Sequence, residues 1–365
     1  MKILFDTSPL CRETKTGIPV FVERLYSALS QRDDIHLEKT FCFCKYLPRK
    51  PWYFYRLIEH IFYHSLYLPF KLTFGKYDVY IENQYMFIPL FKPKNTLIVT
   101  VLYDIALQMF DTIQTQKHTQ RWRKRVPKSI KNSDLLLTIS KSSKKDIEAY
   151  LHTIEQAQKP VEYIYIDADI KTQTIQNPKE ILAHLNIHHD YFLFLGTLEP
   201  RKNPLKLIEA FHLFKRTTKS NIKLVFAGKK GWLYDEVLAY IERHHLEHEV
   251  IFTGFVSSRE KYALLKQTKA FLFLSLYEGF GIPALEALRL NTPTLLSDIA
   301  VFHELFGNNA LYTDHNDTKA IASAMQNILE NPPHIHQEDF QKFSWTKASD
   351  RLVQILKQTK GTAQR

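Results

Sequence analysis

The sequence predicts an α/β fold with two doubly wound domains. Short runs of buried-strand character alternate along the chain with segments of helical spacing, as in the βαβ units of parallel sheets. The first strand, Lys2 to Asp6, leads through a loop into the apolar periodicity of a helix, which is how a doubly wound domain begins. The length of 365 residues accommodates two domains of ordinary size.

Composition and charge restrict the class of protein. The chain is 45% hydrophobic, and its three cysteines show no pairing pattern, so we expect a globular protein of a reducing compartment. It shows no signal-peptide core and no apolar run of the roughly 18 to 20 residues that a spanning helix needs, which predicts a cytoplasmic protein. The net charge of +11 predicts attraction to an anion: nucleic acid, a phosphorylated substrate or a membrane surface.

In the first half, Gly17 lies between the first strand and its helix, where it can be a simple turn glycine. Further strands are predicted at Asp78 to Ile81, Thr96 to Leu102 and Asp134 to Ile139. The second of these ends at Tyr103 and Asp104, and Asp104 can also be a helix cap or turn residue. Ser143 is expected to cap a helix that begins near Lys144.

The segment Phe41 to Lys76 has an unusual composition, with 12 aromatic residues, six Lys or Arg and a single acid. Rings interleaved with basic residues suit the boundary between water and lipid headgroups. A helical hairpin packed on the domain explains the composition equally well. Binding of single-stranded nucleic acid is the least favoured alternative, because no RNA-binding signature accompanies the rings.

The second half repeats the alternation after a polar linker, Asp167 to Lys179. Its first strand, Tyr191 to Leu195, is followed by Arg201 and Lys202 just ahead of a helix. Basic residues in that position are placed to meet a phosphate.

The stretch Leu276 to Leu288, LYEGFGIPALEAL, joins a predicted strand to a predicted helix. Gly279 and Gly281 let a phosphate approach the backbone, while the free N–H groups of the helix point toward it. Glu278 and Glu286 would accept hydrogen bonds from hydroxyl groups. Diphosphate and hydroxyl recognition together predict a nucleotide sugar as the ligand.

This Glu-seven residues-Glu pattern, set in EGFGxPxLEA, resembles the signature of the family-four retaining glycosyltransferases, also called glycosyl transferases group 1. The resemblance, which is mannosyltransferase-like, implies the GT-B fold: two Rossmann-like domains facing across a cleft. It implies an acceptor-binding domain over 1–170, with 41–76 as a membrane or acceptor insertion. A nucleotide-sugar-binding domain would cover 171–344, and a helix over 345–365 would cross back to the first domain.

The resemblance also implies roles for particular residues. Lys202 matches the family's diphosphate-binding lysine, and Gly17 matches a segment that closes over the donor phosphates. Asp104 matches the second member of the family's His-Asp pair, whereas Tyr103 departs from its first member. The residues expected in catalysis are Asp104, Lys202 and Glu278. Those expected to bind substrate are Gly17, Tyr103, Arg201, Gly254, Gly279, Phe280, Gly281 and Glu286.

The implied activity is transfer of a hexose, with mannose as a candidate, from a nucleotide diphosphate sugar to a growing glycan. The acceptor would be polyprenyl-linked, in lipopolysaccharide or another surface polysaccharide, and the enzyme would be peripheral on the inner face of the plasma membrane. No cofactor, metal or nucleic acid is expected. The histidine pairs at i,i+4 spacing lack a third ligand; they are His60 and His64, His184 and His188, and His244 and His248. A nucleotide-sugar epimerase on the same fold and a non-catalytic nucleotide-sugar-binding module are the alternatives.

Overall fold

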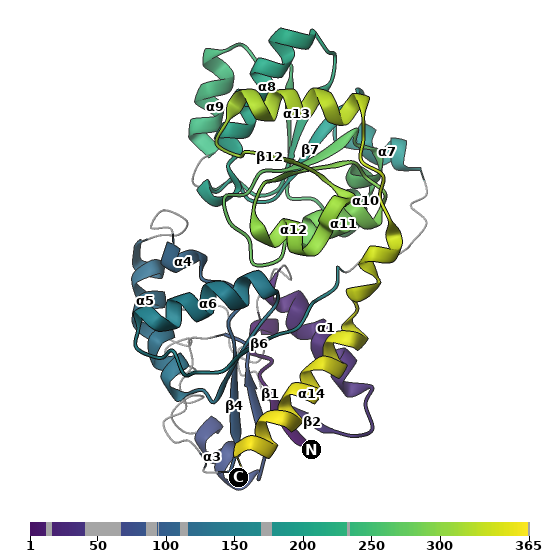
Figure 1. Cartoon of the computed structure of the whole chain (residues 1–365). Coiled ribbons are helices and arrows are strands. Elements are labelled where there is room, and N and C mark those ends of the chain that lie inside the picture. The colour runs from purple at the N-terminus through teal and green to yellow at the C-terminus, as the bar shows by residue number, and fades with distance from the viewer. Residues whose placement is uncertain are drawn as a thin grey trace, which may run out of the picture. The chain divides into compact units, whose positions relative to one another are not determined.

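The computed structural model describes residues 1–11, 17–40, 67–84, 93, 95–109, 116–168, 177–231 and 234–363. The chain divides into two compact units, the first formed by 1–166 with 342–365 and the second by 167–341. Each unit contains a six-stranded sheet flanked by helices (Figure 1). The predicted fold class, α/β with two doubly wound domains, is confirmed.

The sheet of the first unit is entirely parallel, in the order β2-β1-β3-β4-β5-β6. Its strands are β1 (Lys2–Phe5), β2 (His36–Lys39), β3 (Val79–Glu82), β4 (Leu97–Val101), β5 (Leu135–Thr138) and β6 (Val161–Tyr163). The chain moves from β1 to β2 on one side and then returns to β3 on the other. This reversal creates a topological switch point between β1 and β3, and in such sheets ligands bind at the carboxyl ends beside it.

The helices of the first unit are α1 (Ile18–Ser30), α3 (Leu68–Phe74), α4 (Ala106–Met109), α5 (Gln116–Asn132), α6 (Lys141–Thr153) and α14 (Trp345–Ala363). Helix α14 begins at the residue expected from the sequence and runs beside α1 (Figure 1). The rings of Phe21 and Trp345 lie 6.0 Å apart, and Lys357 pairs with Asp34 at 2.8 Å. The last residues of the chain therefore pack on its first ones.

The start of α6 differs from the prediction. Ser140, and not Ser143, is the cap: its hydroxyl oxygen accepts a hydrogen bond of 3.0 Å from the backbone N–H of Ser143. The helix begins at Lys141 because Ser140 has the extended backbone that an N-cap requires, whereas Ser143 already lies in the first helical turn.

The second unit repeats the design with a parallel sheet in the order β12-β11-β10-β7-β8-β9. Its strands are β7 (Tyr191–Leu195), β8 (Lys223–Ala227), β9 (Val250–Gly254), β10 (Ala270–Phe273), β11 (Thr294–Ser297) and β12 (Leu311–Thr313). Its helices are α7 (Pro178–His184), α8 (Pro204–Thr218), α9 (Tyr234–Arg243), α10 (Ser258–Gln267), α11 (Ile282–Arg289), α12 (Ala300–Phe306) and α13 (Thr318–Glu330). Helices α8, α9 and α13 cover one face, and the other helices cover the opposite face (Figure 1).

An apolar cluster of the second unit lies between its sheet and the α8–α9–α13 layer. Its aromatic members include Phe192 and Phe214, whose rings lie 5.4 Å apart and are almost fully buried. Full burial of such a side chain contributes about 1.5–3 kcal/mol. This core holds the central strands rigidly, and the loops at their carboxyl ends are thereby fixed.

Part of the aromatic segment 41–76 falls outside the described residues, namely 41–66. Its remaining part contains α3, on which Phe70 and Phe74 are 65% and 67% exposed. In the described portion of the chain, no helix has both the length and the apolarity to cross a membrane.

Candidate functional site

The order of the second sheet places its switch point between β7 and β10, which are adjacent and parallel. The loops that leave these two strands, 196–203 and 274–281, therefore emerge side by side at the carboxyl edge. The backbone N–H of Leu276 donates a hydrogen bond of 2.7 Å to the carbonyl oxygen of Arg201, so the loops are joined directly. Open α/β sheets bind their ligands at this position.

Arg201 holds the two loops together through its side chain. Its guanidinium donates to the carbonyl oxygen of Tyr277 at 2.8 Å and lies 2.6 Å from a carboxylate oxygen of Glu278 and 2.8 Å from one of Glu199. The hydroxyl of Ser275 also donates to Glu278, at 3.0 Å. The charge of Arg201 is thus neutralised by direct contact with two carboxylates, and Glu278 is held in one orientation.

Lys202 supplies positive charge that is not neutralised in this way. Its ammonium lies 5.7 Å from the ring centroid of Phe273, and a Cβ atom on Gly196 would lie only 2.2 Å from it. Within the described chain, its ammonium makes no hydrogen bond or ion pair. Burial lowers the pKa of Lys202; Arg201 acts in the same direction, whereas Glu278 and Glu199 oppose the shift. A partly desolvated ammonium of this kind is stabilised by an anionic ligand.

Gly281 forms the N-terminal boundary of α11. Its φ of 95° is in the left-handed region, and a Cβ there would lie 2.7 Å from the ring of Phe302, so a larger residue is excluded. Pro283 lies in the first turn, where a missing N–H is tolerated. Gly279 and the buried Phe280 precede Gly281. The first N–H groups of a helix have no partner within the helix and favour an anion.

The glycines after β7 and β8 bring their loops into backbone contact. A Cβ on Gly228 would lie 2.1 Å from the carbonyl oxygen of Gly196. The N–H of Gly228 donates to the carbonyl oxygen of Gly254, at 2.8 Å, and Gly254 faces open space at the end of β9. Next to it, Phe255 is 61% exposed, with the ammonium of Lys229 at 5.3 Å from its ring centroid. An exposed ring beside an open glycine suits a planar group.

Glu286 is 4% exposed on α11, and the ammonium of Lys261, on α10, lies 2.5 Å from its carboxylate. The sequence analysis missed Lys261. The two residues are 25 positions apart on separate helices, so no local spacing connects them. Their contact follows only from the packing of α10 against α11.

The corresponding edge of the first unit contains a buried polar network at its switch point. Asp6, after β1, accepts hydrogen bonds from the backbone N–H groups of Ser8, at 3.0 Å, and Asn83, at 3.4 Å. Burial raises the pKa of Asp6, although its hydrogen bonds with Ser8, Asn83 and Thr40 act against this. Gly17, exposed and with a φ of 63°, precedes α1.

Tyr103 and Asp104 follow β4 at the same edge. The Tyr103 hydroxyl donates to the carbonyl oxygen of Asn83 at 3.3 Å, and its ring packs edge-on against Phe21 with centroids 5.0 Å apart. Asp104 accepts a hydrogen bond of 3.0 Å from the N–H of Ala106, at the start of α4. Asp104 therefore has the helix-terminus role that the sequence left open, and its role in catalysis stays a prediction.

The expected site residues thus fall into two groups. Within the second unit, Arg201, Lys202, Glu278 and the glycines of 279–281 meet at one switch point. Gly254 and Glu286 belong to neighbouring elements of that unit. In the first unit, Gly17 and Tyr103 are connected through Phe21 on α1.

Comparison with known proteins shows which family the second unit resembles. Residues 181–344 match the family described as glycosyl transferases group 1, which confirms the predicted resemblance. O-antigen chain mannosyltransferase B of Escherichia coli is 28% identical over 239 residues, which cover 64% of this chain and 61% of that protein. O-antigen chain mannosyltransferase RfbU of Salmonella typhimurium is 30% identical over 185 residues, 48% of this chain and 51% of that protein. The chain thus covers less than two thirds of the length of these relatives.

Solved structures share the fold over nearly the whole chain. Sucrose-phosphate synthase from Thermosynechococcus elongatus superimposes with a TM-score of 0.72 at 17% identity, covering 98% of both chains. Anabaena Alr3699/HepE, solved in complex with UDP and glucose, gives a TM-score of 0.68 at 16% identity, covering 98% of this chain and 100% of that one. Because the sequence identity is so low, these structural similarities establish the fold alone, which is GT-B.

Proposed function

We propose that the protein is a retaining hexosyltransferase, on the premise that residues 181–344 match the glycosyl transferases group 1 family. It takes a nucleotide diphosphate sugar as donor and a growing glycan as acceptor. The observation that carries the proposal is the ammonium of Lys202 at the β7–β10 switch point, which makes no hydrogen bond or ion pair with the residues that the structure describes. The diphosphate of a nucleoside diphosphate would give this ammonium a direct anionic partner, which it lacks among the described residues.

Departure of the nucleoside diphosphate places negative charge on its terminal phosphate. Lys202 and the first N–H groups of α11 are fixed before the reaction, so they stabilise this charge without reorganising. Arg201 acts mainly by holding Glu278 and the two loops in place, because its own charge is balanced. These groups supply the electrostatic stabilisation without a metal, and we expect turnover to persist in a chelator.

The nucleoside part of the donor lies, in this proposal, along the edge from α11 to β9. Glu286, oriented by Lys261, accepts hydrogen bonds from ribose hydroxyl groups. Gly254 lets the base approach the backbone, with Phe255 beside it. The second unit would then bind the donor, in keeping with the range 171–344 expected from the sequence.

The first unit, with the expected range 1–170, would bind the acceptor. Gly17 and Tyr103 contact the transferred sugar or its phosphates, and Asp104 is the side-chain candidate for deprotonating the acceptor hydroxyl. Alternatively, the leaving phosphate accepts that proton on the same face of the sugar, which preserves the anomeric configuration. Helix α14 packs on this unit, so the C-terminal helix belongs to the proposed acceptor-binding domain.

The acceptor proposed here is a polyprenyl-linked surface polysaccharide, with mannose as the favoured hexose. Two relatives are named as O-antigen mannosyltransferases, and a Campylobacter jejuni relative, 27% identical over 202 residues, is named as acting on a diphospho-undecaprenol-linked sugar. The exposed Phe70 and Phe74 and the net charge of +11 suit attachment to the inner face of an anionic membrane.

Two measurements test the proposal. A thermal-shift screen with nucleoside diphosphates and their sugars should raise the melting temperature with one base only, since a ligand of the folded state stabilises it. Incubation of the stabilising donor with and without a polyprenyl-linked acceptor then separates the activities. A changed sugar without acceptor would indicate an epimerase, and binding without turnover under both conditions would indicate a binding module.

A further inference from the structure

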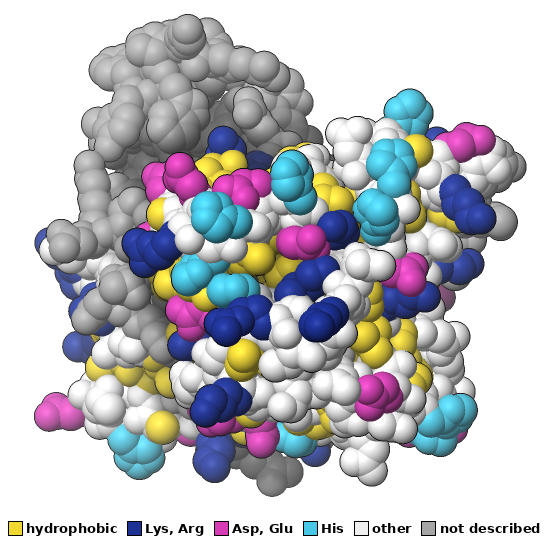
Figure 2. Space-filling view, turned by 90° about the horizontal axis from the view of Figure 1, so that it is seen from above, with side chains coloured by type: hydrophobic (Ala, Val, Ile, Leu, Met, Phe, Trp, Pro, Cys, Tyr) yellow, Lys and Arg dark blue, Asp and Glu magenta, His cyan; other side chains and the backbone are white. Residues whose placement is uncertain are grey.

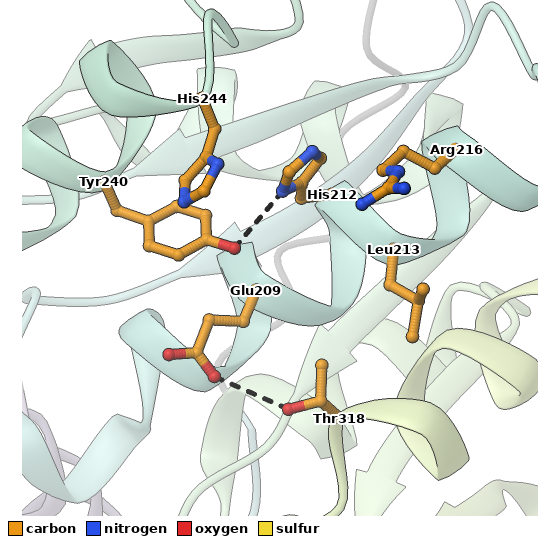
Figure 3. A pocket seen from close by; sticks show the side chains of 7 residues that line it. All are labelled: Glu209, His212, Leu213, Arg216, Tyr240, His244 and Thr318. Carbon is orange, nitrogen blue, oxygen red and sulfur yellow. Dashed lines mark hydrogen bonds between the residues drawn. The ribbon is translucent and has the colours of Figure 1, made fainter.

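A second pocket lies in the α8–α9–α13 layer of the second unit. Its volume is about 390 Å³, within the size range of small-molecule sites (Figure 3). His212 on α8 is two turns from the N-terminus of that helix, about 12 Å along its axis from the donor-site loops. Four lining residues, Glu209, His212, Leu213 and Arg216, lie on α8; Tyr240 lies on α9, His244 follows that helix directly, and Thr318 lies on α13.

Two imidazoles and a phenol are in contact in this pocket. The ring centroids of His212 and His244 lie 4.7 Å apart, and those of Tyr240 and His244 lie 4.3 Å apart. Nδ1 of His212 is 3.2 Å from the hydroxyl oxygen of Tyr240 (Figure 3). This contact orients the His212 ring and directs its other nitrogen away from Tyr240.

The charges around His212 are predominantly basic. Burial lowers the pKa of His212, and the neighbouring His244 and Arg216 lower it further. Arg216 makes no hydrogen bond or ion pair among the residues that the structure describes. Three basic groups, His212, His244 and Arg216, thus line one pocket, and the charges of the other two oppose protonation of His212.

The acid in the pocket does not compensate for these groups. Glu209 pairs with Lys206 at 2.8 Å, and its carboxylate accepts a hydrogen bond of 3.4 Å from Thr318. Figure 3 shows its carboxylate directed toward Thr318 and away from Arg216. Histidine, Lys and Arg side chains are interspersed with Asp and Glu side chains on the face of the molecule seen in Figure 2.

We propose that this pocket binds a phosphate group, either as the free ion or on a phosphorylated monosaccharide. The planar guanidinium of Arg216 offers paired donors to phosphate oxygens, and the imidazoles of His212 and His244 add N–H donors. Leu213 supplies an apolar wall against which the ring of a sugar can lie. The site is independent of donor binding, and its occupant would be a second ligand of the protein.

Binding of phosphate is linked to proton uptake. The charged or titratable groups facing His212 are Glu209 and Arg216 from α8 and Tyr240 and His244 from the α9 side, while α13 contributes the neutral Thr318. A bound anion favours the imidazolium form of His212, so the pKa of His212, which burial lowers in the free protein, rises on binding. The affinity should therefore increase as the pH falls through the range in which His212 gains its proton.

The test follows the imidazole signals of the full-length protein by NMR during titration with potassium phosphate and, separately, with a hexose 1-phosphate. Neither donor-site loop contains a histidine, so the signals of His212 and His244 report on this pocket. Both should shift, and the Arg216→Gln variant should bind about tenfold more weakly or worse, because a charge-assisted contact is lost. Arg243→Gln, which removes an exposed arginine of α9 outside the pocket, is the matched control and should bind normally.

The two ligands distinguish the source of the phosphate. Tighter binding of the hexose phosphate means that the sugar is recognised, whereas equal binding means that free phosphate is the ligand. The proposal is overturned if neither ligand shifts the two imidazole signals, or if Arg216→Gln and Arg243→Gln bind equally well. Donor turnover should be unchanged in Arg216→Gln, which separates this result from any failure of the proposed transferase function.

Discussion

The ammonium of Lys261 lies 2.5 Å from a carboxylate oxygen of Glu286, which is 4% exposed. Two helices meet at this ion pair, α10 and α11, and α11 also carries the glycine boundary of the donor site. A buried carboxylate with a fixed counterion keeps its charge and its orientation. Glu286 is thereby suited to accept hydrogen bonds from hydroxyl groups.

We predict that Lys261→Met weakens binding of the nucleoside diphosphate about tenfold, since Glu286 loses the partner that orients it. The same substitution should weaken binding of the 2′-deoxy and 3′-deoxy analogues much less, because these ligands lack hydroxyl groups that Glu286 contacts. Isothermal calorimetry on the wild type and the variant measures these differences.

Lys266→Met, an exposed substitution on the same helix, is the control and should leave all affinities unchanged. In Glu286→Gln, as in Lys261→Met, the affinity should fall more for the nucleoside diphosphate than for its deoxy analogues. If Lys261→Met weakens the ribose and deoxyribose ligands equally, the ion pair serves folding alone.

Lys202→Ala should lower turnover by roughly 10²-fold or more with the fold intact, because a contact that strengthens in the transition state is removed. Initial rates at saturating donor give this value, and circular dichroism checks the fold. Near-normal turnover would remove Lys202 from the mechanism.

The depressed pKa of Lys202 predicts a pH dependence. In the free protein this ammonium loses its proton below the ordinary value of 10.5, and the neutral amine binds a diphosphate poorly. Donor affinity should therefore fall as the pH rises through that lowered pKa. Lys202→Arg retains its charge over the whole range, so its affinity profile should lack the alkaline decline. If donor affinity falls at the same alkaline pH in both proteins, a group other than Lys202 causes the decline.

Tyr103 tests the departure from the family pattern. Tyr103→His should retain substantial turnover with the same donor if this side chain contacts the transferred sugar. Tyr103→Phe, which loses the hydroxyl bond to Asn83, should lower the free energy of unfolding by about 0.5–1.5 kcal/mol. Complete loss of turnover in a folded Tyr103→His protein would mean that this corner of the pocket is built differently.

The exposed rings of α3 predict membrane attachment. Phe70→Ser combined with Phe74→Ser should reduce co-sedimentation with anionic vesicles, because the apolar surface that enters the headgroup layer is lost. Attachment should also weaken with salt. Phe255→Ser removes an equally exposed ring from the second unit and is the control. If the wild type and the two variants bind the vesicles equally, or if none of them binds, the result would argue for a soluble acceptor.

Much of the fold was determined by the sequence alone. Buried parallel strands are continuous apolar runs, so β7 was located to the residue, and the glycines after β10 marked the turn into α11. Arg201, Lys202 and Glu278 were also identified, because each follows a strand at its carboxyl end. The cap of α6 was assigned three residues late, since Ser140 and Ser143 have similar capping propensity and only the backbone conformation distinguishes them.

Tertiary structure alone decided which charges are paired. Arg201 and Lys202 are neighbours in sequence, yet Arg201 contacts two carboxylates directly, while the ammonium of Lys202 makes no ion pair with the described residues. Glu286 acquired Lys261 from another helix, and His212 met His244 across α8 and α9. Local patterns report a residue's backbone conformation and its burial. The partner of a side chain depends on elements that are distant in sequence, and packing alone brings them together.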